Sequence, residues 1–269
     1  MIIAFNATNI LSSGGIVHLN NILKHADPQK HNFTKIILYA PEQINDFLPK
    51  KKWIKIKSEK LLGENTFQRI FSNRSRKECY KENIDIIYNL NGINICKYIP
   101  NVNLIQNQIP FNFKIIFIYK SLKIILRFIL LRVLMIRSIN KSRGTIFLSK
   151  GSQNEILPQV NIKSNYTIIS HGVDKIFFYK KKPSNSLVDK KNFTLIYVSS
   201  LEPYKNHINL IKALKILNKD FISFKIILIG NGNSNYSKKI KKMIHNENII
   251  DKYIDFIPEV TQNDLKYYY

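Results

Sequence analysis

One lysine, placed where a predicted strand gives way to a helix, is the residue of this chain best suited to chemistry. The segment from Ile196 to Asn206 reads Ile-Tyr-Val-Ser-Ser-Leu-Glu-Pro-Tyr-Lys-Asn, so a β-rich run and a polar turn bring Lys205 to the start of the next helix. A cation fixed at such a position can stabilise the negative charge that builds on a leaving phosphate. By its position alone Lys205 is either such a cation or a solvated lysine in a lysine-rich chain.

The glycines gather where predicted strands end. Five of the nine follow such strands: Gly14, Gly15, Gly172, Gly230 and Gly232. Ligands of open parallel sheets bind at this edge, where helix N-termini expose unpaired N–H groups and glycine lets the backbone approach a phosphate. Tight turns need glycine as well, so each position by itself has two interpretations. Taken together, the five glycines predict an anionic ligand held between two domains.

Histidines and one asparagine are the remaining polar candidates. His171 either contacts a ligand or completes a turn through a backbone hydrogen bond, and Asn107 either binds an acceptor hydroxyl or caps its own loop. His18 is expected to pack or to face solvent, while His207 and Glu202 lack the spacing of metal ligands. We therefore keep Asn107 and His171 as candidates for acceptor binding and predict no metal site.

Short β-rich runs alternate with longer helical patterns, which is typical of a parallel sheet covered by helices. The predicted strands of the first part are Ile2–Phe5, Lys35–Tyr39, Trp53–Ile56, Asp85–Asn89, Asn103–Gln106, Thr145–Leu148 and Tyr166–Ile169, and the predicted helices are Val17–His25, Thr66–Lys81 and Phe113–Ile139. After a polar connector, Lys180–Asn192, the pattern restarts with strands Phe193–Val198, Phe224–Ile229 and Tyr253–Phe256 and with helices Ile208–Leu217, Lys238–His245 and one from Gln262. We predict an α/β protein of two Rossmann-like, doubly wound domains, residues 1–180 and 181–269, the second with too few strands to be complete.

The charge balance is strongly basic, with 42 lysine and arginine residues against 18 acidic ones and a net charge of +24. Such a surface attracts phosphates, anionic lipid or nucleic acid, although a genome biased toward lysine codons would produce the same excess. Nucleic acid is the least favoured partner, because the sequence carries no zinc-finger or RNA-binding signature. The two cysteines, Cys79 and Cys96, exclude a disulfide framework and fit a reducing cytoplasm, and the N-terminus lacks the pattern of an export signal.

The most apolar stretch, from Phe113 to Ile139, carries Lys120, Lys123 and Arg127 at helical spacing. Basic residues interrupt it too often for a helix that spans lipid. Two interpretations remain: an amphipathic helix that rests on an anionic leaflet, or a core helix with lysines facing solvent.

The segment around Lys205 resembles the donor-domain motif of retaining, two-domain glycosyltransferases of the GT-B type, in the large group called family 4. That motif reads approximately Val-Gly-Arg-Leu-x-x-x-Lys-Gly/Asn before an amphipathic helix. It is matched here at Val198, Leu201, Lys205 and Asn206, and this match favours Lys205 as the catalytic cation. Ser199 and Ser200 replace the glycine and the arginine, so half of the usual phosphate-binding Arg/Lys pair is missing.

Five other segments resemble family elements in the right order: Gly14–Gly15, Ile146–Ser149, Ile168–Asp174, Leu228–Gly232 and Ile254–Leu265. The loop Gln106–Phe111 resembles a loop found in the family members that assemble polysaccharides. The resemblance implies a GT-B fold and the transfer of a hexose, with retention of configuration, from a nucleotide-sugar to a lipid-linked bacterial acceptor such as an O-antigen or capsule precursor. It implies no cofactor beyond the donor substrate. The donor-binding residues that it implies are Gly14, Gly15, Gly172, Ser199, Ser200, Lys205, Gly230 and Gly232.

The family's Glu-x7-Glu pair is not found, since Glu259 is the final glutamate. We therefore expect a chain truncated before that pair, and we keep two interpretations of its activity: a cytoplasmic transferase at the inner face of the membrane, or an inactive remnant or partner subunit that binds glycan or membrane. Unpaired strands in a curtailed second sheet also predict association with another chain.

Overall fold

The chain forms two compact units, Met1–His171 and Gly172–Tyr269, in the computed structural model. The structure describes all residues except 12, 60–81, 91, 95, 97–98, 179–191, 218–222, 233, 247–253 and 259. The predicted helix Thr66–Lys81, Cys79 and Glu259 lie outside the described residues, as does the connector that carries the predicted domain boundary, apart from its last residue, Asn192.

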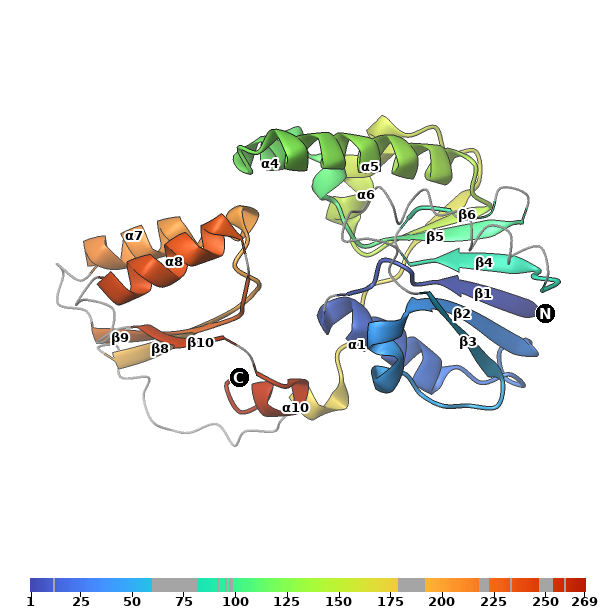
Figure 1. Cartoon of the computed structure of the whole chain (residues 1–269), viewed down its shortest axis with the longest axis horizontal. Helices are drawn as coiled ribbons and strands as arrows, with labels where there is room; N and C mark the ends of the chain where they lie inside the picture. The colour runs from blue at the N-terminus through green and yellow to red at the C-terminus, as the bar shows by residue number, and fades with distance from the viewer. Residues whose placement is uncertain are drawn as a thin grey trace. The chain divides into compact units, whose positions relative to one another are not determined.

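The first unit is built on a parallel sheet of seven strands (Figure 1). The strands are β1 (Ile2–Asn6), β2 (Lys35–Pro41), β3 (Ile54–Glu59), β4 (Ile86–Asn89), β5 (Asn101–Ile105), β6 (Gly144–Phe147) and β7 (Asn165–Ile168). All seven predicted strands are present, with bounds that differ by a few residues. Their order in the sheet is β3-β2-β1-β4-β5-β6-β7, so the direction of strand addition reverses between β1 and β4. Ligands of open parallel sheets bind at the carboxyl ends of the strands beside such a reversal.

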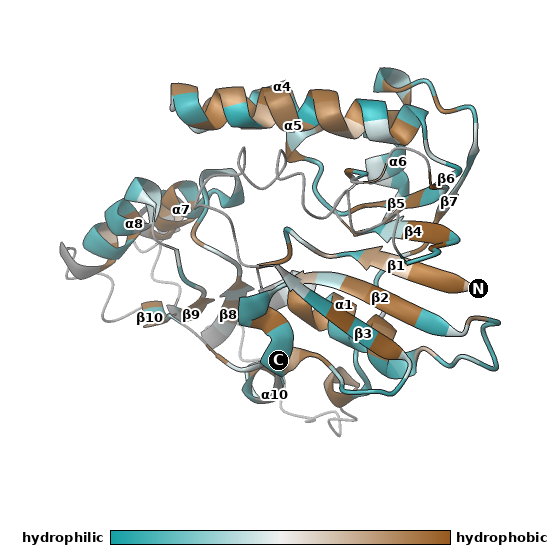
Figure 2. Ribbon diagram, turned by 45° about the vertical axis from the view of Figure 1, so that its right-hand side comes forward, coloured by the Kyte–Doolittle hydropathy of each residue, from teal (hydrophilic) through white to brown (hydrophobic). Residues whose placement is uncertain are grey.

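Alternate residues of the central strands face two separate apolar layers. Phe5 of β1 packs with Leu19 and Leu23 of helix α1 (Ser13–His25), whereas its neighbour Ala4 packs with Ile87 of β4 on the other face. Because both faces of the sheet are buried, its strands read as nearly continuous apolar runs, which Figure 2 shows along β1 and β2.

The predicted single helix Phe113–Ile139 is wrong, because the structure has two helices there. Helix α4 (Phe113–Ile118) begins after Asn112, whose Oδ1 accepts a hydrogen bond from the Ile115 N–H at 3.1 Å. Lys120 then adopts a φ of 50°, a left-handed conformation that a helix cannot continue through, and α5 (Leu122–Asn140) starts after Ser121. A third helix, α6 (Lys150–Ile156), follows β6.

Helix α1 also differs from the prediction, because it begins at Ser13 rather than at Val17. Gly14 and Gly15 therefore lie in the first turn of the helix, several residues after β1 ends at Asn6, and not in a loop directly behind the strand. Glycine is a poor helix former, which is why the sequence pattern predicts too late a start for this helix.

A row of buried asparagines crosses the first sheet where the strand order reverses. Asn6 Nδ2 donates to Asn89 Oδ1 at 3.0 Å, and Asn89 Nδ2 donates to Asn103 Oδ1 at 2.9 Å. The three residues are register partners on β1, β4 and β5, and none is more than 2% exposed. These amides join the strands on both sides of the reversal through side chains as well as through the backbone.

The second unit contains a parallel sheet with the strand order β10-β9-β8. Its elements are β8 (Asn192–Val198), α7 (His207–Leu217), β9 (Ser223–Ile229), α8 (Asn235–Asn246), β10 (Ile254–Ile257) and the short α10 (Gln262–Leu265). Helices α7 and α8 lie on one face of the three strands (Figure 1), where Ile211 and Ile240 pack against Ile226 and Leu228. The predicted restart of the β-α-β pattern is therefore confirmed, with three strands in the described part of this unit.

Candidate functional site

The loops that follow β8 and β9 lie against each other at the carboxyl edge of the second sheet. The Ser199 N–H donates to the Ile229 carbonyl at 2.9 Å, and the Leu201 N–H donates to the Asn231 carbonyl at 3.1 Å. Leu201 is buried beneath them in the core of the unit. The two backbone segments are thus held side by side beyond the ends of their strands.

Gly230 is required by this close approach of backbone to backbone. A Cβ atom at residue 230 would lie 1.8 Å from the Ser199 carbonyl oxygen, and the φ of 152° is one that residues with a side chain rarely adopt. Gly232 is less constrained, since its Cβ would come within 3.1 Å of both the Leu201 carbonyl oxygen and the Ser237 side chain. For both glycines the structure therefore supplies a packing reason that does not depend on a ligand.

Lys205 ends the short 3-10 turn Pro203–Lys205, and one residue separates it from the start of α7. The next residue, Asn206, adopts a left-handed φ of 62°, which asparagine tolerates better than most residues. The Tyr197 hydroxyl donates to the Lys205 carbonyl at 2.6 Å and so fixes this turn to β8. The Lys205 ammonium lies 5.1 Å from the centre of the Tyr204 ring, in a cation–π arrangement.

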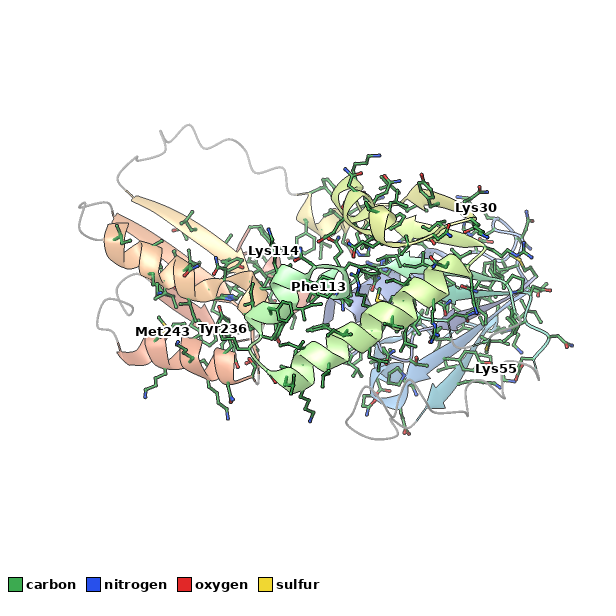
Figure 3. All side chains as sticks on the ribbon, turned by 90° about the horizontal axis from the view of Figure 1, so that it is seen from above. Lys30, Lys55, Phe113, Lys114, Tyr236 and Met243 are labelled. Atoms are coloured by element: carbon green, nitrogen blue, oxygen red, sulfur yellow. The ribbon has the colours of Figure 1, made fainter. Side chains whose placement is uncertain are left out.

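A buried histidine organises the other side of the same loop. His207 is only 2% exposed, its Nε2 is hydrogen-bonded to Ser199 Oγ at 3.1 Å, and its ring packs 4.9 Å from that of Tyr197. Tyr236 comes from α8 (Figure 3) and places its ring 6.4 Å from the same histidine. Burial, together with the charge of Lys205, lowers the pKa of His207, so the imidazole is neutral beside the lysine.

In the first unit, His171 is brought onto the helix that carries Gly14 and Gly15. Its ring lies 4.3 Å from that of His18 on α1, with the planes at 67°. Burial lowers the pKa of His171, and burial followed by the proximity of His171 lowers the pKa of His18 to about 4. Both rings are therefore neutral near pH 7, and His18 Nε2 is buried without a hydrogen-bond partner among the described residues.

The structure places the remaining candidates separately. Asn107 lies after β5, where its Oδ1 accepts a hydrogen bond from the Ile109 N–H at 3.1 Å, an arrangement that supports the loop-capping interpretation. A Cβ atom at Gly14 or at Gly172 would have no described atom within 4 Å, so packing does not require glycine at either position. Ser200 is exposed on the loop after Ser199.

Sequence reasoning missed the tyrosines and the histidine that support the Lys205 loop. Tyr197 and Tyr236 read as ordinary apolar positions of a strand and a helix, and the sequence raised only a metal-ligand role for His207. The sequence signal that could have revealed these supporting roles is that Tyr197, Ser199 and His207 lie within or next to the motif that contains Lys205. Within the described part of the chain, no group of three or more histidine, cysteine or acidic side chains could hold a metal ion.

Comparisons with known proteins agree with this architecture. Residues 178–269, a stretch within the second unit, match the model of the family described as glycosyl transferases group 1. No curated protein matches the chain by sequence.

Solved structures resemble the chain over nearly its whole length. The HepE protein of Anabaena, solved in complex with UDP-glucose, has 17% identity and a TM-score of 0.62, covering 99% of this chain and 70% of HepE. A sucrose-phosphate synthase from Thermosynechococcus elongatus has 10% identity and a TM-score of 0.66, and the match covers 100% of this chain and 73% of the synthase. A UDP-N-acetylglucosamine 2-epimerase from Rickettsia bellii has 14% identity and a TM-score of 0.56, and the match covers 98% of this chain and 70% of the epimerase.

These likenesses define a GT-B fold, with a parallel α/β sheet in each of two units and a smaller second unit. Because an epimerase shares it, the fold alone does not distinguish transfer from other nucleotide-sugar chemistry. The family match in the second unit is what supports a glycosyltransferase.

Proposed function

We propose that the protein is a retaining glycosyltransferase, of the family 4 type, that moves a hexose from a nucleotide-sugar to a lipid-linked bacterial surface polysaccharide. The observation that carries the proposal is the Lys205 turn, which is pinned by Tyr197 and flanked by the paired loops of β8 and β9. This turn lies inside the region that matches the glycosyltransferase family model. The complex of HepE with UDP-glucose supports a nucleotide-sugar as the donor.

The chemistry follows from the charge that the reaction creates. As the sugar leaves, its diphosphate gains negative charge, and the Lys205 ammonium beside the N-terminus of α7 would stabilise it through a fixed charge and the partial positive charge of the helix end. The neutral His207 does not repel the Lys205 ammonium, and it holds the Ser199 hydroxyl through a hydrogen bond. The nucleotide-sugar serves as substrate, and no further cofactor is proposed.

A lipid-linked acceptor would place the protein at the inner face of the cytoplasmic membrane. The loop Gln106–Phe111 resembles a loop of the family members that assemble polysaccharides, and this resemblance supports the acceptor class. Association with another chain through β8 and β10, the outer strands in the described part of the second sheet, remains part of the proposal, because edge strands carry unpaired backbone groups.

Replacement of Lys205 tests the donor site. We expect Lys205→Ala to weaken the binding of nucleoside diphosphates in calorimetry and to lower sugar transfer by about 10²-fold, the typical cost of removing one preorganised contact to developing charge. Lys212→Ala is the matched control, since Lys212 is an exposed lysine on the same α7.

The assay should follow transfer and epimerisation of the same nucleotide-sugar. Equal binding and turnover in the two lysine variants would remove Lys205 from the mechanism. Nucleotide-sugar epimerisation without transfer would instead favour the activity named for the Rickettsia bellii neighbour.

A further inference from the structure

Helices α4 and α5 expose seven large apolar side chains, which together we call the α4–α5 apolar face. Its members are Phe113, Phe117, Ile118, Leu122, Leu126, Ile129 and Val133. Leu122 is 73% exposed and Phe117 is 58% exposed, which is unusual for side chains of this size. The four members on α5 follow helical spacing and therefore form one stripe.

This stripe is not the side of α5 that packs on the protein. A second set, Phe128, Leu131, Met135 and Ile139, is buried and makes the contacts of the helix with the first unit. Helix α5 is thus apolar on two sides, and only one of them has a partner among the described residues. Contiguous exposed apolar patches of this kind mark interaction surfaces in soluble proteins.

The charged side chains of α4, α5 and the turn between them are all basic, and the acidic side chain beside α4, Glu155 of α6, accepts a hydrogen bond from Asn112 Nδ2 at 2.7 Å. Lys114, Lys120, Lys123, Arg127 and Arg137 are exposed on or between the two helices, and Figure 3 shows Lys114 beside Phe113 on α4. The sequence contains no aspartate or glutamate from residue 86 to residue 154. Two copies of this face pressed together would repel each other without any acidic partner, whereas anionic headgroups complement it.

We propose that the α4–α5 apolar face docks on an anionic lipid leaflet. The two helices lie parallel to the membrane plane, the apolar side chains enter the boundary between headgroups and acyl chains, and the flanking lysines and arginines contact the headgroups. Among the described residues no helix is both long and apolar enough to cross a bilayer. This inference goes beyond the proposed activity, because vesicle binding requires neither donor nor acceptor.

Co-sedimentation of the full chain with vesicles tests the proposal. Vesicles of equal parts phosphatidylglycerol and phosphatidylcholine should bind the protein at low salt, and vesicles of phosphatidylcholine alone should bind it much less. Leu122→Ser with Leu126→Ser should weaken binding about 100-fold, because two leucine side chains no longer leave water. Lys120→Gln with Lys123→Gln should weaken it about 30-fold, and added salt should reduce the difference.

Matched controls distinguish vesicle binding through this face from nonspecific binding by other exposed apolar or basic side chains. Phe47→Ser removes a side chain that is 61% exposed but lies outside the face, in the 3-10 turn Glu42–Phe47. Lys30→Gln with Lys50→Gln removes the same charge elsewhere, and Lys30 lies away from Phe113 in Figure 3. Both controls should bind vesicles as the wild type does. Thermal unfolding of every variant verifies that the fold is intact, which is expected because all of the replaced side chains are exposed.

The proposal is overturned by any of three results. These are no co-sedimentation of the wild type with anionic vesicles at low salt, equal binding by the α4–α5 variants and their controls, and a concentration-dependent dimer that the leucine variants abolish. The last result would assign the face to a protein partner. None of these outcomes depends on catalysis, so the proposed transferase can fail while the membrane contact stands.

Discussion

Replacing Gly230 by alanine should destabilise the second unit, because the new Cβ has no room. The atom would lie 1.8 Å from the Ser199 carbonyl oxygen, while ordinary van der Waals contact begins at 3.4 Å, so the loops after β8 and β9 must separate by 3.4 − 1.8 = 1.6 Å. That movement stretches the two backbone hydrogen bonds that join these loops, from the Ser199 N–H to Ile229 and from the Leu201 N–H to Asn231.

The expected cost follows from these two terms. Two weakened hydrogen bonds contribute about 1–3 kcal/mol, and alanine at a φ that only glycine adopts readily contributes about 1–3 kcal/mol more. We therefore expect Gly230→Ala to lower the free energy of unfolding by about 2–6 kcal/mol, measured by urea denaturation of the full chain. An unfolding free energy equal to that of the wild type would refute the argument that backbone packing requires this glycine.

Gly14→Ala is the matched control and decides between the two interpretations of the glycines. Gly14 lies in the first turn of α1 with nothing within 4 Å of its Cβ position, so alanine there should leave stability unchanged or raise it by about 0.5–1 kcal/mol. If Gly14→Ala nevertheless weakens the binding of nucleotide-sugar or acceptor, this glycine serves the approach of a ligand. Unchanged binding would leave no ligand role for it.

Two further predictions concern the first unit. Asn89→Leu should lower the free energy of unfolding by about 2–4 kcal/mol, because Asn6 Nδ2 and Asn103 Oδ1 lose a buried partner; urea denaturation checks it, with the exposed Asn209→Leu as control. Stability should also fall as the pH drops from 6.5 toward about 4, because the His18 pKa is lowered in the folded state and the unfolded chain takes up the proton first. His18→Gln should make this decline shallower, and an identical pH profile for the variant and the wild type would contradict the lowered pKa.

The strands could be predicted from sequence because parallel strands buried on both faces leave long apolar runs. The glycosyltransferase motif also pointed to the loop that the structure shows packed around Lys205. The break between α4 and α5 could not be predicted, since a lysine in a left-handed conformation leaves no signature in the sequence. The approach of His18 to His171 was equally hidden, because contacts between residues far apart in the chain depend on how the whole sheet is assembled.

The asparagine row gives the first sheet a register that backbone pairing alone would not enforce. Its amides all point the same way, from the Thr8 hydroxyl donating to Asn6 Oδ1 through to Asn89 Nδ2 donating to Asn103 Oδ1. A slip of β4 by one residue would turn Asn89 to the opposite face and remove one buried hydrogen bond each from Asn6 Nδ2 and Asn103 Oδ1. The loops that follow β1, β4 and β5 therefore begin at fixed positions relative to one another. Their sequences can change without shifting the register of the strands.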